Sequence, residues 1–212
     1  MRCSQCQGIE EHFDPKVAEG DLERYRHKGP SNTTRRLING IVGLGIENAT
    51  LLDIGGGIGA IQLELLKRGL GEAIGAEASS AYAEFARQAA TDAGLVDKTR
   101  QITGDFVELA PEIPQVDIVT LDRVICCYHD WDQLVRLSTA KARRVYAAAY
   151  PRDGWWVRAL LWFENVIHRA RGTSFRTYAH PVGRIHELIN DAGFEAVSVE
   201  KTLVWRVEIY RR

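Results

Sequence analysis

The sequence has few of the residues that would indicate a cross-linked or membrane-spanning protein. It contains 212 residues, among them four cysteines, six prolines and one methionine. Four cysteines in a chain of this length are too few for a disulfide scaffold and are typical of a reducing compartment. No apolar run reaches about 18 residues, and the N-terminus lacks the apolar core of a signal peptide. We therefore expect a cytoplasmic protein with no transmembrane segment.

An excess of either charge is also missing. The chain carries 27 lysines and arginines against 28 aspartates and glutamates, which gives a formal net charge of -1. Without an overall positive charge the chain has no general attraction to nucleic acid, and we expect no nucleic-acid partner. Apolar residues make up 45% of the chain, enough for a sizeable core at this length. These values favour a single domain over residues 1–212.

A strand, a carboxylate and a tight turn follow one another in residues 51–60, LLDIGGGIGA. Leu51, Leu52 and Ile54 predict a buried parallel strand, and residues 58–69 predict an amphipathic helix. The glycines between them let the backbone turn sharply and approach a ligand closely, because no Cβ is in the way. This order of elements is typical of a nucleotide-binding crevice.

Two kinds of ligand fit this loop. The spacing of Gly55, Gly57 and Ala60 satisfies the dinucleotide-binding pattern, and Glu77 follows about twenty residues later, where that pattern expects a ribose acceptor. On the glycine spacing alone, NAD is therefore still a candidate ligand. Asp53 argues against it, because a carboxylate before the loop repels a pyrophosphate at a helix N-terminus. S-adenosylmethionine (SAM) has an ammonium and a sulfonium group and no phosphate, so an acidic residue at this point suits it.

Strands and helices alternate through the middle of the chain. We expect strands at 72–77, at 99–104, at 116–122 and in the run RVYAAAY that Pro151 ends, with helices at 79–94 and 130–142 among them. Two helices at 15–29 and 33–45 precede the first strand, and Ser31 or Asn32 caps the second. Such alternation predicts a parallel, doubly wound sheet with right-handed crossovers.

The last third of the chain departs from this alternation. Residues 154–172 predict an aromatic helical insert, and residues 180–194 predict another helix. The runs 196–202 and 204–212 lie too close together for a helical crossover, so they predict an antiparallel hairpin.

The predicted fold class is therefore α/β. It is a Rossmann-like, seven-stranded, mostly parallel sheet with a C-terminal antiparallel hairpin, an N-terminal helical cap and a helical insert after strand 5. Within the single domain we assign the cap to 1–48, the cofactor-binding core to 49–150, the insert to 151–175, and the last helix and hairpin to 176–212.

From Thr50 to Arg212 the order of elements resembles the class I SAM-dependent methyltransferases, in their small-molecule branch. The glycine loop, the segments GAEAS and TGDF and the final hairpin carry the resemblance. It implies SAM as the cofactor and a small molecule as the methyl acceptor. The cofactor contacts that it implies are Asp53, Gly55 and Gly57 at the methionine moiety, Glu77 with Ala78 at the ribose, and Asp105 with Phe106 at the adenine.

The fourth strand ends in LDRVICCYHDW, where the resemblance implies residues that face the cofactor and the acceptor. It implies Asp122 for the cofactor and Arg123 for the acceptor. His129 is the first candidate for a general base, because an unperturbed imidazole takes up a proton near neutral pH, and Tyr128 is the second. The alternative is that His129 merely precedes the next helix. No Asn/Asp-Pro-Pro-Tyr/Phe motif follows, which favours small-molecule acceptors, and the segment faintly resembles magnesium-protoporphyrin O-methyltransferases.

Two further groups of residues are open to more than one interpretation. Tyr25 lies in a basic N-terminal segment that is either a solvated face or a lid whose tyrosine bonds the SAM carboxylate. The aromatic insert either packs on the core, lines an apolar acceptor pocket that includes Trp156, or forms a homodimer face, with a membrane-surface contact as a lesser alternative. Arg176 and Tyr178 follow the insert, and we expect them to face the acceptor.

The four cysteines form two pairs, a CxxC of Cys3 and Cys6 and the adjacent Cys126 and Cys127. Adjacent residues of a strand point to opposite faces, so the second pair cannot turn both thiolates to one metal. We expect no metal site.

The sequence thus favours methyl transfer from SAM to an oxygen or nitrogen of a small, partly hydrophobic acceptor. An NAD(P)-dependent oxidoreductase that uses the same glycine loop and Glu77 is the first alternative. A non-catalytic SAM-binding module that regulates a partner is the second.

Overall fold

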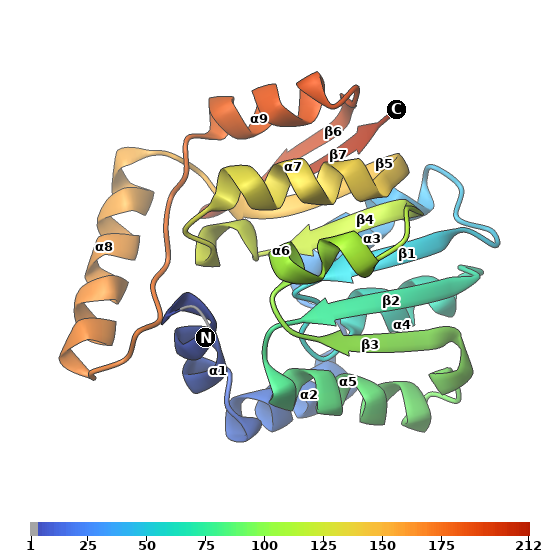
Figure 1. Cartoon of the computed structure of the whole chain (residues 1–212), viewed down its shortest axis with the longest axis horizontal. Helices are drawn as coiled ribbons and strands as arrows, with labels where there is room; N and C mark the ends of the chain where they lie inside the picture. Colours follow the sequence, from blue (N-terminus) through green and yellow to red (C-terminus); the bar gives the residue numbers. More distant parts are fainter. Residues whose placement is uncertain (1–3) are drawn as a thin grey trace.

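The structure, a computed structural model, describes the backbone of residues 4–212 and the side chains of residues 8–212, built around one seven-stranded sheet (Figure 1). In chain order the strands are β1 (Thr50–Ile54), β2 (Glu72–Glu77), β3 (Thr99–Thr103), β4 (Val116–Asp122), β5 (Ala142–Pro151), β6 (Glu195–Lys201) and β7 (Trp205–Arg211). Their order across the sheet is β3-β2-β1-β4-β5-β7-β6. The first five are parallel, and β7 pairs antiparallel with both β5 and β6. The predicted sheet, with its C-terminal hairpin, is confirmed.

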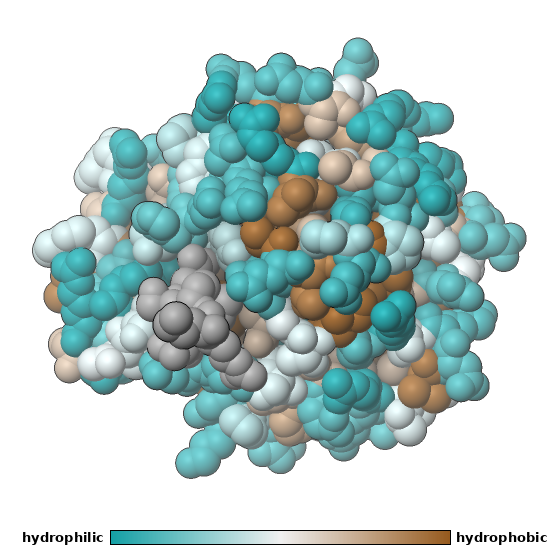
Figure 2. Space-filling view, viewed as in Figure 1, coloured by the Kyte–Doolittle hydropathy of each residue, from teal (hydrophilic) through white to brown (hydrophobic). Residues whose placement is uncertain are grey.

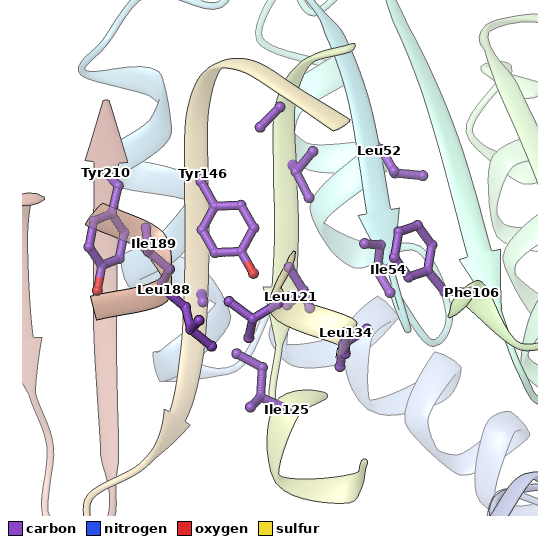
Figure 3. Close-up of a cluster of buried hydrophobic side chains, with 14 of the residues drawn as sticks. Leu52, Ile54, Phe106, Leu121, Ile125, Leu134, Tyr146, Leu188, Ile189 and Tyr210 are labelled. Carbon is purple, nitrogen blue, oxygen red and sulfur yellow. The ribbon is translucent and has the colours of Figure 1, made fainter. Parts of the chain in front are cut away.

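Helices cover both faces of the sheet, because successive residues of a buried strand point to opposite sides. Leu52 packs with α6 (Phe106–Leu109), α7 (Trp131–Lys141) and α9 (Val182–Asp191), in the cluster drawn in Figure 3. Its neighbour Leu51 packs on the opposite face with α3 (Asn32–Val42) and α4 (Ala60–Leu66). This two-sided burial holds the ends of the central strands in fixed positions.

The expected caps fix two helix starts near the site. Ser79 caps α5 (Ser80–Asp92) by accepting a hydrogen bond from the backbone N–H of Tyr82, and Ser31 does the same for α3 with Thr34. The helix α2 (Pro15–Lys28) starts behind Asp14, which accepts from the N–H of Val17. These are the interactions that exposed N–H groups at a helix start require.

Several elements differ from the prediction. The helices α1 (Ser4–His12) and α6 were not predicted, and β5 starts earlier than expected and runs through Pro151, which pairs with Trp205. The segment assigned to an N-terminal cap also includes α3, which packs against the sheet as part of its core layer, so it is only partly a cap.

The aromatic insert forms α8 (Trp155–Ala170), which stands at one end of the molecule beside α1 (Figure 1). Trp155, Trp162 and Phe163 expose 81%, 67% and 57% of their surface, whereas Val157 and Leu161 are buried. The expectation that the aromatic side chains of the insert pack on the core is therefore wrong for these three residues.

Polar side chains cover most of the face seen in Figure 2, and hydrophobic ones gather near its middle, over α6 and α7. None of the helices in the described part of the chain combines the length and the apolar character needed to span a bilayer.

Candidate functional site

A cavity of about 760 Å³ opens at the carboxyl ends of the parallel strands. Its wall includes the glycine loop after β1, Glu77 at the end of β2, Asp105 after β3 and Asp122 at the end of β4. On the other side, residues of α1, α2 and α8 close it. The carboxyl edge of an open parallel sheet is where such folds bind their ligands.

The glycine loop needs residues without a Cβ. Gly55, Gly57 and Gly59 have φ of 61°, 58° and 76°, in the left-handed region that favours glycine. A Cβ on Gly55 would also lie 2.6 Å from a methyl carbon of Val124, and one on Gly57 would lie 3.3 Å from the ring of Tyr82. The loop therefore presents bare backbone to the cavity, as the sequence predicts.

Asp53 lies behind this loop, fully buried and outside the cavity wall. Its carboxylate accepts hydrogen bonds from Thr120 Oγ1 at 2.6 Å and Gln62 Nε2 at 3.1 Å. Burial raises the pKa of Asp53 to about 7, and these two hydrogen bonds partly oppose that rise. Its position thus differs from the expected direct contact with the cofactor, since the backbone of the loop lies between the carboxylate and the cavity.

Glu77 is the buried carboxylate that does line the cavity. Its Oε2 accepts from the backbone N–H of Gly57 at 2.9 Å, and its Oε1 accepts from the N–H of Ser79 at 3.0 Å. Burial raises its pKa, and these backbone hydrogen bonds act in the opposite direction. A carboxylate has about four lone-pair sites, so Glu77 retains acceptor capacity for a ligand hydroxyl. Ala78 lines the cavity next to it.

Asp105 and Tyr128 meet across the cavity wall. The hydroxyl of Tyr128 donates to the Asp105 carboxylate at 2.7 Å, and Asp105 also caps α6 by accepting from the N–H of Val107 at 2.9 Å. Phe106, the first residue of α6, is buried and lines the cavity beside them. The site thus has an acceptor oxygen and an aromatic ring side by side, as an adenine requires.

The end of β4 brings a further carboxylate and a cation to the cavity wall. Asp122 accepts from Thr34 Oγ1 of α3 at 2.5 Å and from Arg123 Nε at 3.3 Å. Arg123 has a φ of 63°, which is uncommon for a residue with a side chain. Both residues line the cavity, where the sequence predicts them.

Tyr25 also lines the cavity, but its hydroxyl donates to Glu64 Oε1 at 2.9 Å. Burial raises the pKa of Tyr25, so it stays protonated. The hydroxyl hydrogen of Tyr25 is thus already bound to Glu64 in this structure, and it does not point to a SAM carboxylate as the sequence analysis expected. The neighbouring Arg24 pairs with Asp21, and both line the cavity, whereas Arg26 pairs with Asp92 outside it.

Four residues expected at the acceptor or the base lie outside the cavity wall: His129, Trp156, Arg176 and Tyr178. His129 is exposed and follows Tyr128, which is in the wall, and its ring packs against that of Tyr178 with centroids 5.8 Å apart. The guanidinium of Arg176 donates to the carbonyls of Thr173 and Phe175. The structure thus brings Tyr128 and Arg123 to the cavity and leaves these four beside it or away from it.

The wall opposite the glycine loop is made of residues that the sequence analysis did not select. They are chiefly His12, Phe13, Leu160, Leu161, Glu164, Ile167, His168, Phe175 and Thr177. A signal was present in α8, because residues 160, 164, 167, 168 and 171 recur at the spacing of one helical face. No comparable signal linked α1 to α8, since the two helices are far apart in the sequence.

Cys126 and Cys127 lie in a short turn after β4 and both line the cavity, with their sulfur atoms 3.7 Å apart, so the expectation that they point to opposite faces of a strand is wrong. Cys3 and the side chain of Cys6 lie outside the described residues. Among the side chains that the structure describes, no three histidines, cysteines or carboxylates gather as a metal site would require.

Comparison with known proteins agrees with this geometry. Residues 51–147 match a family model described as a methyltransferase domain. This span starts at β1 and ends within β5, so it holds the glycine loop and the three strand ends that line the cavity. No curated protein sequence matches the chain.

Solved structures share the fold over nearly the whole chain. Magnesium protoporphyrin IX methyltransferase from Synechocystis PCC 6803 with bound SAM is 15% identical, with a TM-score of 0.71 over 98% of this chain and 97% of that one. A Haloferax volcanii protein solved in a complex with the methyltransferase activator Trm112 is 17% identical, with a TM-score of 0.72 over 96% of both chains. Mitomycin 7-O-methyltransferase is 22% identical, with a TM-score of 0.65 over 95% of this chain and 59% of that one.

The antiparallel β7 between β5 and β6 distinguishes this sheet from an all-parallel dinucleotide-binding one. The family model covers the glycine loop, and a structure with the same fold holds SAM. Residues 51–147 of the chain therefore form a methyltransferase domain, and the chain as a whole has the fold of the SAM-dependent methyltransferases.

Proposed function

We propose that this enzyme methylates an oxygen or nitrogen of a small, partly hydrophobic acceptor. The observation that carries the proposal is that one cavity has two chemically different ends. One end holds bare backbone and the carboxylates of Glu77, Asp105 and Asp122, and the other is formed by side chains of α1 and α8 that are mostly apolar or aromatic, with Glu164 and Arg171 among them. A cofactor rich in donor groups fits the first end, and an apolar acceptor fits the second.

The residues at the first end suit the parts of SAM. Gly55 and Gly57 allow the methionine moiety to approach the backbone, and Glu77 with Ala78 suits the two ribose hydroxyls. Asp105 offers oxygen atoms to the adenine amino group, with Phe106 against the ring. Asp122 faces the positive charges of the cofactor. Asp53 supports the loop from behind, where Thr120 and Gln62 hold its carboxyl group by hydrogen bonds.

When bound, SAM supplies an activated methyl group on a positively charged sulfur. The acceptor atom attacks the methyl carbon in line with the sulfur, the carbon–sulfur bond breaks to leave S-adenosylhomocysteine (SAH), and a proton leaves the acceptor. Positioning of the two reactants supplies much of the rate. Tyr128, in the wall, and His129, which follows it at the edge, are the proposed partners for the proton.

The named acceptors of two similar structures support a ring-shaped, partly apolar acceptor. One of those enzymes acts on magnesium protoporphyrin IX, and the other methylates an oxygen of mitomycin. Leu160, Leu161 and Phe175 provide an apolar wall of the kind that such a molecule needs.

We also propose that two copies of the chain associate through α8. Trp155, Trp162 and Phe163 are large apolar side chains that stay exposed in the single chain. An exposed aromatic face of this kind is typical of a protein interface.

The proposal is tested by incubating the enzyme with methyl-labelled SAM and a metabolite extract, followed by mass spectrometry of the products. Label in a small organic product, together with formation of SAH, is the expected result. SAM binding without any labelled product would favour the non-catalytic SAM-binding module. Labelling of protein or nucleic acid in place of a small molecule would contradict the proposed acceptor class.

A further inference from the structure

Two imidazole rings meet in the acceptor end of the cavity, and the methyl transfer described above does not use them. His12 ends α1 and His168 lies on α8, and the segment that follows α8 runs between these two helices (Figure 1). Their rings are in edge-to-face contact with centroids 5.0 Å apart, and both line the cavity. A few polar groups among apolar side chains such as Leu160, Leu161 and Phe175 are the pattern by which a pocket fixes the orientation of a ligand.

Aromatic packing holds this pair in place. Phe175 stacks on His12 with centroids 4.1 Å apart and an angle of 1° between the rings, and its edge meets His168 at 5.3 Å. Phe13 packs edge-on against His12 at 4.8 Å. A Cβ on Gly8 of α1 would lie only 2.7 Å from the backbone of Phe175, so α1 approaches this segment as closely as the backbone allows. The rings are therefore preorganised before any ligand binds.

A buried hydroxyl in the same wall has no partner. Thr177 lines the cavity, and among the described residues its Oγ1 is the buried side-chain polar atom with no hydrogen bond. Its backbone is fixed by Asn165, which accepts from the N–H of Thr177 at 2.9 Å and donates to its carbonyl at 2.7 Å. Because an unsatisfied buried hydroxyl is costly, this atom points to a ligand that completes its hydrogen bonding.

The charges around the pair keep His12 neutral. Burial lowers the pKa of His12, and the nearby His168 lowers it further, while Asp14 acts in the opposite direction. Glu164 and Arg171 of α8 also line this part of the cavity, with opposite charges. A neutral imidazole has one nitrogen that accepts a hydrogen bond, so the site has an acceptor in His12 and a donor in the Thr177 hydroxyl.

We propose that His12, His168 and Thr177 bind the hydroxyl group of an aromatic acceptor, whose ring packs against the apolar wall beside Phe175. The hydroxyl donates to an imidazole nitrogen, and its oxygen accepts from Thr177. This inference rests on the proposed function, because it identifies the acceptor class of the same cavity. It assigns to the three residues a role in binding and orientation and leaves the transfer of the methyl group to the other end.

The test uses two probes of similar shape, para-cresol and para-xylene. Para-cresol has a hydroxyl group where para-xylene has its second methyl group. Their dissociation constants are measured by NMR titration of the enzyme saturated with SAH. The loss of one neutral hydrogen bond corresponds to a roughly two- to tenfold decrease in affinity. We expect His12→Phe and Thr177→Val each to weaken para-cresol by roughly this factor and to leave para-xylene unchanged.

His12→Phe keeps an aromatic ring against Phe175, and Thr177→Val keeps the shape of the side chain, so both variants preserve the packing. His27→Phe is the matched control, because His27 is exposed on α2 and lies outside the cavity wall. The inference is overturned if para-cresol does not bind at its solubility limit, or if both variants keep its affinity or weaken the two probes equally. Failure of SAH to bind would instead contradict the proposed function, so the two failures are distinguishable.

Discussion

The Glu77 carboxylate accepts a hydrogen bond from the backbone N–H of Gly57 at 2.9 Å. This contact ties the end of β2 to the glycine loop after β1, between two neighbouring parallel strands. It fixes at once the bare backbone of the loop and the orientation of the carboxylate that faces the cavity. The two features that suit SAM at this end therefore depend on each other.

Glu77→Gln should weaken SAH binding. The amide keeps one acceptor oxygen but loses the charge, and a hydrogen bond to a charged group contributes about 1.5–3 kcal/mol, so we expect roughly a ten- to hundredfold rise in the dissociation constant by calorimetry. Glu72→Gln is the matched control, because Glu72 starts the same strand and is exposed. Equal affinity of the two variants would argue against ribose binding by Glu77.

Gly55→Ala should destabilise the protein and reduce SAH affinity together. Gly55 has a φ of 61°, and an added Cβ would lie 2.6 Å from Val124, so both the backbone and the packing oppose the methyl group. We expect a loss of about 1 kcal/mol or more in the free energy of unfolding, measured by urea denaturation. Gly20→Ala on α2, where nothing lies within 4 Å of the new Cβ, should stabilise by roughly 0.5–1 kcal/mol. A loop unaffected by Gly55→Ala would contradict the geometry described for it.

Asp53→Asn should change how stability depends on pH. The folded-state pKa of Asp53 is raised to about 7 from an ordinary 3.8. The contribution of Asp53 to the free energy of unfolding is therefore fully present below pH 3.8 and is lost as the pH rises through 7. Asparagine does not titrate, so the variant does not lose stability in this way. The free energy of unfolding of the variant should therefore exceed that of the wild-type protein by an amount that grows between pH 4 and 8, towards about 4 kcal/mol at most. Urea denaturation across that range measures it. A constant difference between the two proteins would mean that Asp53 is charged in the folded state throughout.

The succession of strands and most helices along the chain could be predicted from the sequence, because the buried strands and the glycine and serine positions carry local signals. That Glu77, Asp105 and Asp122 meet at one side of the cavity was predictable for the same reason, since each stands at or just after the end of a strand. The position of Asp53 behind the loop was not, because it depends on side chains from β4 and α4 that reach it in space.

The acceptor end was the least predictable part. It forms where α1 meets α8, and the contact between His12 and His168 joins two segments that are far apart in the sequence. The residues of α1 show no apolar stripe that would have predicted a packed helix. The insert misled the prediction in another way, because its aromatic side chains suggested burial, whereas its buried face is carried by Val157 and Leu161.

Trp162→Ser with Phe163→Ser should convert a dimer into a monomer. Both side chains are exposed on α8, and light scattering after size-exclusion chromatography reports the mass directly. Val197→Ser is the control, since Val197 is 51% exposed on β6, away from α8. A wild-type protein that is monomeric at high concentration would contradict the proposed association.

Calorimetry of the wild-type protein with SAM, SAH, NAD and NADP tests the central claim most directly. The carboxylate-rich end of the cavity, with its bare glycine backbone, predicts that SAM and SAH bind at one site per chain and that NAD and NADP do not. Binding of NAD or NADP without binding of SAM would contradict the account.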